Sequence, residues 1–260
     1  MELGLSGKAA LVTGGSRGIG AAIATELARE GVHVCLVARD RTKLHQVAAS
    51  LTTNTVHTAV HVADLRDPHA AAQAVATTIA AFGRLDILVN NAAATKRDDF
   101  FTLTDEDFLD GFALKFHGAV RMTRAAWPHL QETKGCIVNI AGVGAHKGSA
   151  DFTIGGSVNA ALLNFTKAMS DIGIQQGVRV NAINPGLIET ERYTRNVERI
   201  MREQSLTRAQ AIAARLATHR TTRVGRPEEV GTLVAYLASD KADFIQGALI
   251  DIDGGSTRAL

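Results

Sequence analysis

The chain has 260 residues, of which 46% are hydrophobic, and its formal net charge is +2. This composition allows one large core, and so small a charge, with no basic stripe, does not indicate a nucleic-acid partner. Residues 1–8 hold no signal sequence and no apolar run is long enough to span a bilayer. We therefore expect a cytoplasmic protein without nucleic-acid or membrane partners. Cys35 and Cys136 lie in apolar runs and suit two buried thiols, and their spacing predicts no metal site.

Short β-branched runs alternate with longer stretches of helical pattern along the chain. We expect strands at 9–13, 32–38, 55–62, 85–90, 136–140, 179–183 and 249–252, and helices at 19–30, 42–51, 157–175 and 228–238, with others between the central strands. Strands that read as nearly continuous apolar runs are buried on both faces, which predicts a mainly parallel sheet with helices on each side. Right-handed βαβ succession then gives a doubly wound α/β fold in a single domain, 1–260.

One stretch breaks this alternation. Residues 188–223 follow a strand but are charged and helical in pattern. Insertions of this kind lie beyond the carboxyl ends of the strands, so we expect a lid over the ligand crevice. Its charges alternate in sign, which leaves the substrate undetermined.

The first strand runs into the sequence TGGSRGIG, residues 13–20, ahead of a helical stretch. A glycine-rich turn in this context predicts a phosphate-binding site at a helix N-terminus. Gly14 would permit the tight turn, Gly18 the approach of backbone amides to a pyrophosphate, and Gly20 the close packing of helix on strand.

The end of the second strand indicates which dinucleotide is bound. An acidic residue there would bind the 2′-hydroxyl of NAD(H), but the strand ends in Arg39. Arg39 and Arg17 could pair with a 2′-phosphate, and Ser16 could donate a hydrogen bond to it. We therefore expect NADP(H), with NAD(H) as the alternative if the strand ends one residue later and Asp40 binds the ribose.

These motifs together resemble the short-chain dehydrogenase/reductase family over essentially the whole chain. Residues 13–20 match its TGxxxGIG turn, Asn90-Asn91-Ala92-Ala93 its NNAG segment with Ala93 for glycine, and Asn184-Pro185-Gly186-Leu187-Ile188-Glu189-Thr190 its NPGxxxT segment. Asp64-Leu65, 226–230 and 251–255 match further family segments. The resemblance implies a Rossmann fold and a cofactor site formed by Gly14, Ser16, Arg17, Gly18, Ile19, Gly20, Arg39, Asp64, Leu65, Asn91, Ala92, Asn159, Pro185, Gly186, Ile188 and Thr190.

The resemblance also fixes where the catalytic Asn, Ser, Tyr and Lys of the family are expected. The segment 160–162 sets a register that puts Gly155 at the tyrosine position and Asn159 at the lysine position. Gly142 falls at the serine position and Lys115 at the asparagine position. In a sister pattern of this superfamily the tyrosine comes three residues earlier, where this chain has Phe152. Neither register supplies the usual phenol.

Lys115 and Asn159 look like an exchange of residue types between two helices that meet below the nicotinamide. Asn159 could bind the ribose, and Lys115 could supply positive charge or, if desolvated, a proton. The alternative is that Lys115 is a surface lysine. Weaker candidates are His146 and Lys147 on a substrate-facing loop, Asp151 as a possible helix cap, and Tyr193, which we expect to be a packing aromatic of the lid.

The leading hypothesis is an atypical NADP(H)-dependent oxidoreductase that acts on the carbonyl or alcohol of a small molecule, with Lys115 and Asn159 as its catalytic residues. A non-redox enzyme and a non-catalytic NADP(H)-binding protein are the alternatives, because intact nucleotide motifs suit all three. The family resemblance implies a homo-oligomer, a tetramer or dimer, packed through the helices that carry Lys115 and Asn159 and through the last strand.

Overall fold

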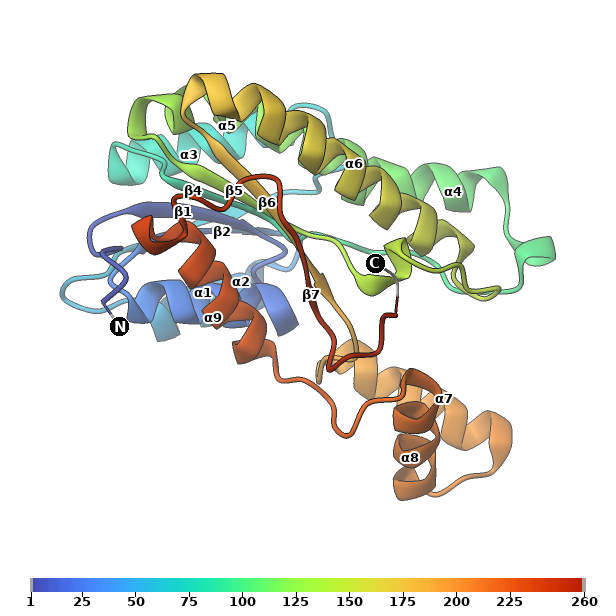
Figure 1. The fold of residues 1–260 in the computed structure, drawn as a ribbon. Helices are drawn as coiled ribbons and strands as arrows, with labels where there is room; N and C mark the ends of the chain where they lie inside the picture. The colour runs from blue at the N-terminus through green and yellow to red at the C-terminus, as the bar shows by residue number, and fades with distance from the viewer. Residues whose placement is uncertain (1, 259–260) are drawn as a thin grey trace.

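The computed structural model describes residues 2–258 and is built on one seven-stranded sheet (Figure 1). All strand pairs are parallel, in the order β3-β2-β1-β4-β5-β6-β7. The strands are β1 (Ala9–Thr13), β2 (His33–Ala38), β3 (Thr58–Val62), β4 (Ile87–Asn90), β5 (Cys136–Ile140), β6 (Arg179–Pro185) and β7 (Leu249–Ile252). The strand order reverses between β1 and β4, so the predicted doubly wound Rossmann-type fold is confirmed.

Helices cover both faces of the sheet (Figure 1). One layer holds α1 (Gly18–Arg29), α2 (Arg41–Leu51) and α9 (Pro227–Ala238), and the other holds α3 (Ala70–Phe82), α4 (Asp105–Phe112), α5 (Gly118–Thr133) and α6 (Thr153–Gln176). Short helical turns are η1 (Phe100–Thr102), η3 (Val143–Ala145) and η4 (Asp240–Ala242), and the π-helical turn η2 (Ala113–His117) joins α4 to α5. The central strands β1, β4 and β5 are buried along their whole length, as a sheet covered on both faces requires.

Two expected boundaries are wrong for local reasons. The third strand begins at Thr58 and not at 55, because Thr53 and Val56 bond to each other in a turn before it. The helix α6 begins at Thr153, four residues before the expected start at 157. The pair Gly155-Gly156 has poor helix propensity, but Ile154 is fully buried and the Phe152 ring covers Gly155, so packing extends the helix.

The stretch 188–223 folds into two helices, α7 (Glu191–Gln204) and α8 (Arg208–His219), beyond the carboxyl end of β6 (Figure 1). They enclose a small apolar cluster of their own with Leu187, Tyr193, Val197 and Ala211 at its centre. We refer to α7 and α8 as the lid helices. Across residues 2–258, no helix has both the length and the apolar character to span a membrane.

Candidate active site

The carboxyl ends of β1 and β4 meet where the strand order reverses, the position at which doubly wound sheets bind ligands. Gly14 adopts a φ of +67° in the turn after β1, a conformation that favours glycine. The side-chain amide of Asn91, just after β4, donates to the carbonyl oxygens of Thr13 (2.9 Å) and Gly14 (3.3 Å). A Cβ on Gly20 would overlap the Gly14 carbonyl. The tight turn and the close helix packing predicted from the glycines are therefore present.

The N-terminus of α1 has the features of a phosphate site. Its N-cap residue Arg17 makes no side-chain capping bond, so no side chain occupies the first free N–H groups of the helix. Gly18 has a φ of +56°, and a side chain there would meet only Thr190. Uncapped amides at a helix N-terminus, beside glycines that keep the approach open, fit a dinucleotide pyrophosphate.

The residues around the end of β2 also suit a phosphate. Arg39 lies directly after the strand, with Nη1 3.6 Å from the Asp64 carboxylate. Asp40 instead accepts a hydrogen bond from the backbone N–H of Lys43 (3.0 Å) as the N-cap of α2. The strand β2 ends at Ala38, and the Asp40 carboxylate caps α2. The structure therefore does not support the alternative in which Asp40 binds the ribose of NAD(H).

The remaining predicted cofactor residues lie around the same edge. The backbone N–H of Ala92 donates to Thr13 Oγ1 (3.0 Å), and Leu65 is buried beside Gly118. Pro185 ends β6 and Thr190 caps α7 by accepting from the N–H of Tyr193 (3.3 Å). Ser16 and Ile19 belong to the turn and first turn of α1, and Gly186 and Ile188 lie in the segment after β6.

Lys115 is buried, with 9% of its surface exposed, in the π-helical turn η2. Its Nζ donates to the Ala141 carbonyl oxygen (2.8 Å) and to the side-chain oxygen of Asn159 (2.5 Å). Burial, and to a lesser degree the charge of Arg192 on α7, lower the pKa of Lys115 to about 7. The reading of Lys115 as a surface lysine is therefore wrong. π-Helical turns often occur at functional sites, because they shift a side chain out of the regular helical register.

The helix α6 presents Gly155 and Asn159 one turn apart beside Lys115. The Phe152 ring occupies the space that a side chain at Gly155 would need. Gly142, after β5, has a φ of +153°, and a Cβ there would lie 3.1 Å from Asn159 Nδ2. A glycine at each of these positions thus leaves room for Phe152 and Asn159.

Three of the weaker candidates make contacts that do not indicate a catalytic role, and one of them lacks the helix-capping role considered for it. His146 Nε2 lies 3.0 Å from the Asp251 carboxylate on β7, so its ring is held toward that edge strand. Asp151 does not cap α6, whose N-cap is Phe152, and pairs instead with Arg97 (2.6 Å). Tyr193 is buried in the lid cluster, as expected of a packing aromatic, although its hydroxyl has no hydrogen-bond partner among the described residues.

Sequence reasoning missed the link between the lid and the nucleotide turn. Glu191, the first residue of α7, accepts from Arg17 (3.2 Å) and from Lys43 (3.3 Å). Lys43 thereby joins Arg17 and Arg39 near the turn as a third basic group. No motif pointed to Glu191, since the three residues lie far apart in sequence and meet only through the fold. Among residues 2–258, no group of three His, Cys, Asp or Glu side chains is placed to hold a metal ion.

Comparison with known proteins gives matches over almost the whole chain. A family model described as enoyl-(acyl carrier protein) reductase matches residues 14–257. Versicolorin reductase 1 of Aspergillus parasiticus is 32% identical over 98% of this chain and 98% of its own length. The NADPH-dependent reductase BacG of Bacillus subtilis is 31% identical over 98% of this chain and all of its own.

The solved structures agree with the sequence matches. L-Sorbose reductase from Gluconobacter frateurii, in complex with NADPH and L-sorbose, superposes with a TM-score of 0.95 over 100% of both chains at 31% identity. The family match, the relatives and the solved structure all agree with the nucleotide turn and the sheet topology described above. This chain therefore belongs to the short-chain dehydrogenase/reductase family.

Proposed function

We propose that this protein is an NADP(H)-dependent oxidoreductase that interconverts a carbonyl and an alcohol on a small molecule, and that Lys115 takes the place of the family's phenol in proton transfer. The observation that carries the proposal is the buried amine of Lys115, bonded to Ala141 and Asn159 at the carboxyl edge of the sheet. A non-catalytic NADP(H)-binding protein, one of the two alternatives from the sequence, gives no reason for a buried amine at this place, and the nucleotide turn favours an oxidoreductase over a non-redox enzyme.

The cofactor preference rests on the charges around the turn. Arg17, Arg39 and Lys43 would hold a 2′-phosphate, and the first-turn amides of α1 would hold the pyrophosphate. NADPH-dependent relatives and an NADPH-bound structural neighbour support the same choice. When bound, the cofactor supplies or accepts the hydride.

Lys115 can move a proton without losing its position. An ammonium has three N–H donors, and two of them are bonded to Ala141 and Asn159. The third is free for the oxygen of a substrate. A pKa of about 7 places the amine between its two forms near neutral pH, which is the best range for general acid–base catalysis. After the proton is given up, both protein hydrogen bonds persist, so the amine is held for the return step.

Asn159 is the positioning residue for this amine. Its side-chain oxygen accepts from Lys115, which leaves the amide nitrogen as a donor. That nitrogen faces the space beside Gly142 and Gly144, where we propose that it binds the nicotinamide ribose or the substrate. The half-buried ring of Phe152, which packs over Gly155, would exclude water from this side of the pocket.

The proposed function is tested with the purified full chain and a panel of ketones, keto acids and aldehydes. NADPH oxidation by at least one carbonyl compound, faster than NADH oxidation and reversible with the matching alcohol and NADP⁺, is the expected result. Tight binding of NADPH without oxidation by any compound would favour the non-catalytic alternative. Substrate consumption without a change in NADPH absorbance would favour the non-redox enzyme.

We further propose a homo-oligomer assembled through α5 and α6. These helices border a groove with apolar side chains that include Trp127, Phe165, Met169 and Ile172. Light scattering of the purified protein, compared with a Trp127→Glu variant, tests the assembly.

A cytoplasmic location suits Cys35 and Cys136, which are buried free thiols with pKa values raised by burial to about 11.

A further inference from the structure

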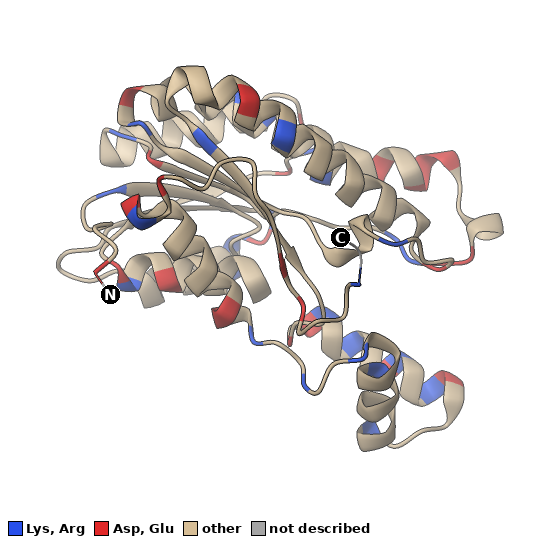
Figure 2. Cartoon of the chain, viewed as in Figure 1, with Lys and Arg blue, Asp and Glu red and all other residues tan. Residues whose placement is uncertain are grey.

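The first lid helix begins against the phosphate turn. Thr190, the N-cap of α7, lies so close to Gly18 that a Cβ on this glycine would be 3.4 Å from Thr190 Cγ2. The next residue, Glu191, is the acidic residue in the first turn of α7, and its carboxylate accepts from Arg17 Nη1 (3.2 Å). Figure 2 shows that α7 carries both acidic and basic positions. The lid therefore places a negative charge beside the turn that is proposed to bind phosphate.

The Glu191 carboxylate joins the lid to two helices of the nucleotide-binding half. One oxygen accepts from Arg17, the N-cap of α1, and the other accepts from Lys43 Nζ (3.3 Å) in the first turn of α2. Arg195, one turn further along α7, lies 3.6 Å from the same carboxylate. Both oxygens of one side chain are thus bound to the basic residues that would otherwise face the cofactor.

These pairs are of the kind that can be exchanged. The side chains of Arg17, Lys43 and Glu191 are 52%, 40% and 49% exposed, so they are free to turn. Exposed ion pairs are weak, because water solvates both partners well. Within residues 2–258, Glu191 is the one carboxylate within ion-pair distance of Arg17 and of Lys43. A ligand with a stronger negative charge can therefore take both basic groups at a small cost.

A carboxylate and a phosphate compete for the same donors. Both present anionic oxygens, and a phosphate monoester carries more charge and one more oxygen than a carboxylate. The hydrogen bond from Lys43 holds the pKa of Glu191 below its usual range, so this carboxylate is charged at neutral pH. A phosphate at Arg17 and Lys43 would meet that charge at close range. Arg17 and Lys43 can therefore serve the lid or the phosphate, but not both fully at once.

We propose that Glu191 is a specificity-determining residue for the cofactor: its carboxylate competes with the 2′-phosphate of NADP(H) for Arg17 and Lys43, and the exchange releases the start of the lid from α1 and α2. This inference deepens the proposed function and rests on its phosphate site. NAD(H) has no 2′-phosphate, so Glu191 would keep its pairs when NAD(H) binds. Glu191 thus weakens the binding of NADP(H) selectively and reduces the preference over NAD(H).

The release would loosen one side of the lid and leave the other side in place. Arg192, next to Glu191, donates from Nη2 to the carbonyl oxygen of Ala93 in the loop after β4 (3.3 Å). This contact involves neither Arg17 nor Lys43, so it does not depend on the 2′-phosphate. The start of α7 would therefore stay tied to the loop after β4 while it separates from α1 and α2.

The competition is tested by calorimetry on the full chain with NADP⁺ and NAD⁺, which differ only in the 2′-phosphate. Glu191→Gln keeps the shape of the side chain and removes its charge. The variant should bind NADP⁺ roughly three- to tenfold more tightly than the parent, since two exposed ion pairs no longer compete. Its affinity for NAD⁺ should change less than about twofold. In a Lys43→Met background the gain from Glu191→Gln should shrink, because one of the contested cations is gone.

The release of the lid is tested by amide hydrogen exchange with each cofactor at saturation. Peptides from the first two turns of α7 should exchange faster with NADP⁺ than with NAD⁺. In Glu191→Gln the two cofactors should give the same exchange, because the pairs with α1 and α2 are lost in either case. Equal exchange with both cofactors in the parent protein would overturn the release of the lid.

The matched control is Glu203→Gln, which removes the same charge from a carboxylate that pairs with Arg199 (2.7 Å), roughly 18 Å further along α7. It should leave the binding of both cofactors unchanged. An unchanged NADP⁺ affinity in Glu191→Gln would overturn the proposal. Equal gains for NADP⁺ and NAD⁺ would overturn it as well, because the carboxylate would then act on the pyrophosphate that both cofactors share.

A second variant separates this inference from the proposed phosphate site. Arg39 lies 3.6 Å from Asp64 and forms no ion pair with Glu191 among the described residues. If Arg39→Ala weakens NADP⁺ selectively while Glu191→Gln has no effect, the phosphate site stands and only the competition fails. If Arg39→Ala affects both cofactors equally, the phosphate site fails and the competition fails with it. Both measurements are of binding, so neither depends on turnover.

Discussion

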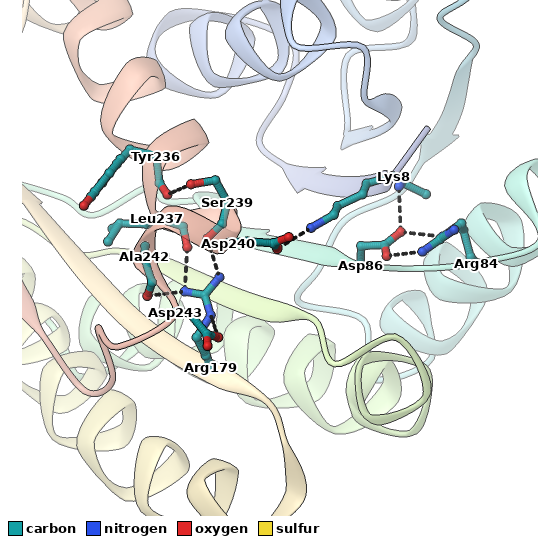
Figure 3. Close-up of polar contacts among 11 residues, drawn as sticks. Lys8, Arg84, Asp86, Arg179, Tyr236, Leu237, Ser239, Asp240, Ala242 and Asp243 are labelled. Atoms are coloured by element: carbon teal, nitrogen blue, oxygen red, sulfur yellow. Dashed lines mark hydrogen bonds and ion pairs between the residues drawn. The ribbon is translucent and has the colours of Figure 1, made fainter. Parts of the chain in front are cut away.

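The two ends of the sheet hold their charged residues in opposite ways. At the amino end, Asp86 is buried and accepts hydrogen bonds from the Ala9 N–H (2.8 Å) and from two nitrogens of Arg84 (2.8 and 2.7 Å) (Figure 3). Arg179 donates to the carbonyl oxygens of Leu237 (2.7 Å) and Ser239 (3.2 Å), which ties β6 to the end of α9. These charges are satisfied by the protein itself.

At the carboxyl end some buried polar groups lack such partners, although exposed pairs such as Arg17–Glu191 form there as well. The buried amine of Lys115 has two neutral acceptors and no carboxylate partner among the described residues, and the charge that acts on its pKa, that of Arg192, has the same sign. Arg215 and Tyr193 keep buried polar atoms without partners. Buried polar groups without partners, together with a strongly lowered lysine pKa, are found more often at functional sites than elsewhere in a fold. We propose that the amino end stabilises the sheet and that the carboxyl end carries out the chemistry.

The largest effect should follow from Lys115→Met, which keeps the length of the side chain and removes the amine. Turnover of NADPH with any accepted carbonyl compound should fall by roughly a hundred- to ten-thousandfold, the usual contribution of a general acid–base group. NADPH binding should persist, because Arg17, Arg39 and the α1 amides are untouched. Steady-state kinetics and a fluorescence titration measure the two. Lys167→Met on the exposed side of α6 is the control, and unchanged turnover in Lys115→Met would refute the role.

The opposite outcome is expected at the amino end. Asp86→Ala leaves the Ala9 N–H and Arg84 without their acceptor, and should lower the free energy of unfolding by about 3 kcal/mol. Urea denaturation measures the loss. The turnover of the folded fraction should stay within about twofold of the parent protein, since the substitution lies at the far end of the sheet. A folded Asp86→Ala variant with strongly reduced turnover would contradict the proposal that only the carboxyl end of the sheet is catalytic.

The burial of Lys115 should also make stability depend on pH. Its pKa is about 7 in the folded protein and 10.5 ordinarily, so the unfolded chain binds more protons between these values. The cost of burying the amine is therefore full below pH 7 and is relieved as the pH rises through this window. The free energy of unfolding of the parent minus that of Lys115→Met should rise from pH 7 upward, by at most about 1.4 kcal/mol per pH unit. Parallel curves would contradict the lowered pKa.

A smaller effect is expected at the nucleotide turn. Arg39→Ala removes one of three basic groups near the proposed 2′-phosphate, so NADPH should bind about tenfold more weakly. NADH has no such phosphate, and its binding should change less than about twofold. Calorimetry with both cofactors measures this selectivity. Equal losses for NADPH and NADH would show that Arg39 supports the turn rather than the phosphate, and would weaken the preference for NADP(H).

Much of the fold could be predicted from the sequence, because its strands are nearly uninterrupted apolar runs and its phosphate turn is local. Strands at 9–13, 136–140 and 249–252 have the predicted bounds. The start of α6 was missed because Gly155-Gly156 has poor helix propensity, and only the fold shows that Phe152 packs over it. The sequence pattern predicts the bounds of an element well where the element's own residues determine them. It predicts them poorly where a contact with a distant residue determines them.

The candidate site divides in the same way. Lys115 and Asn159 were found because motifs fix their register, and the structure brings their side chains together. The Nε of Arg215, which has no partner within residues 2–258, was not found, because Arg215 is an ordinary charged residue in the sequence and only the fold sets its surroundings. Glu191 was missed for the same reason, since its partners Arg17 and Lys43 lie on other elements.

The central claim is that the carboxyl end of the sheet holds a lysine that titrates near neutral pH. The most direct test is an NMR titration of the protein labelled with ¹³C at lysine Cε, with the Lys115 signal identified by its loss in Lys115→Met. We expect one lysine with an apparent pKa near 7, while the other lysines titrate near their ordinary value of 10.5. A Lys115 signal that titrates with the others would contradict it, and the amine could then only orient the substrate as a permanent charge.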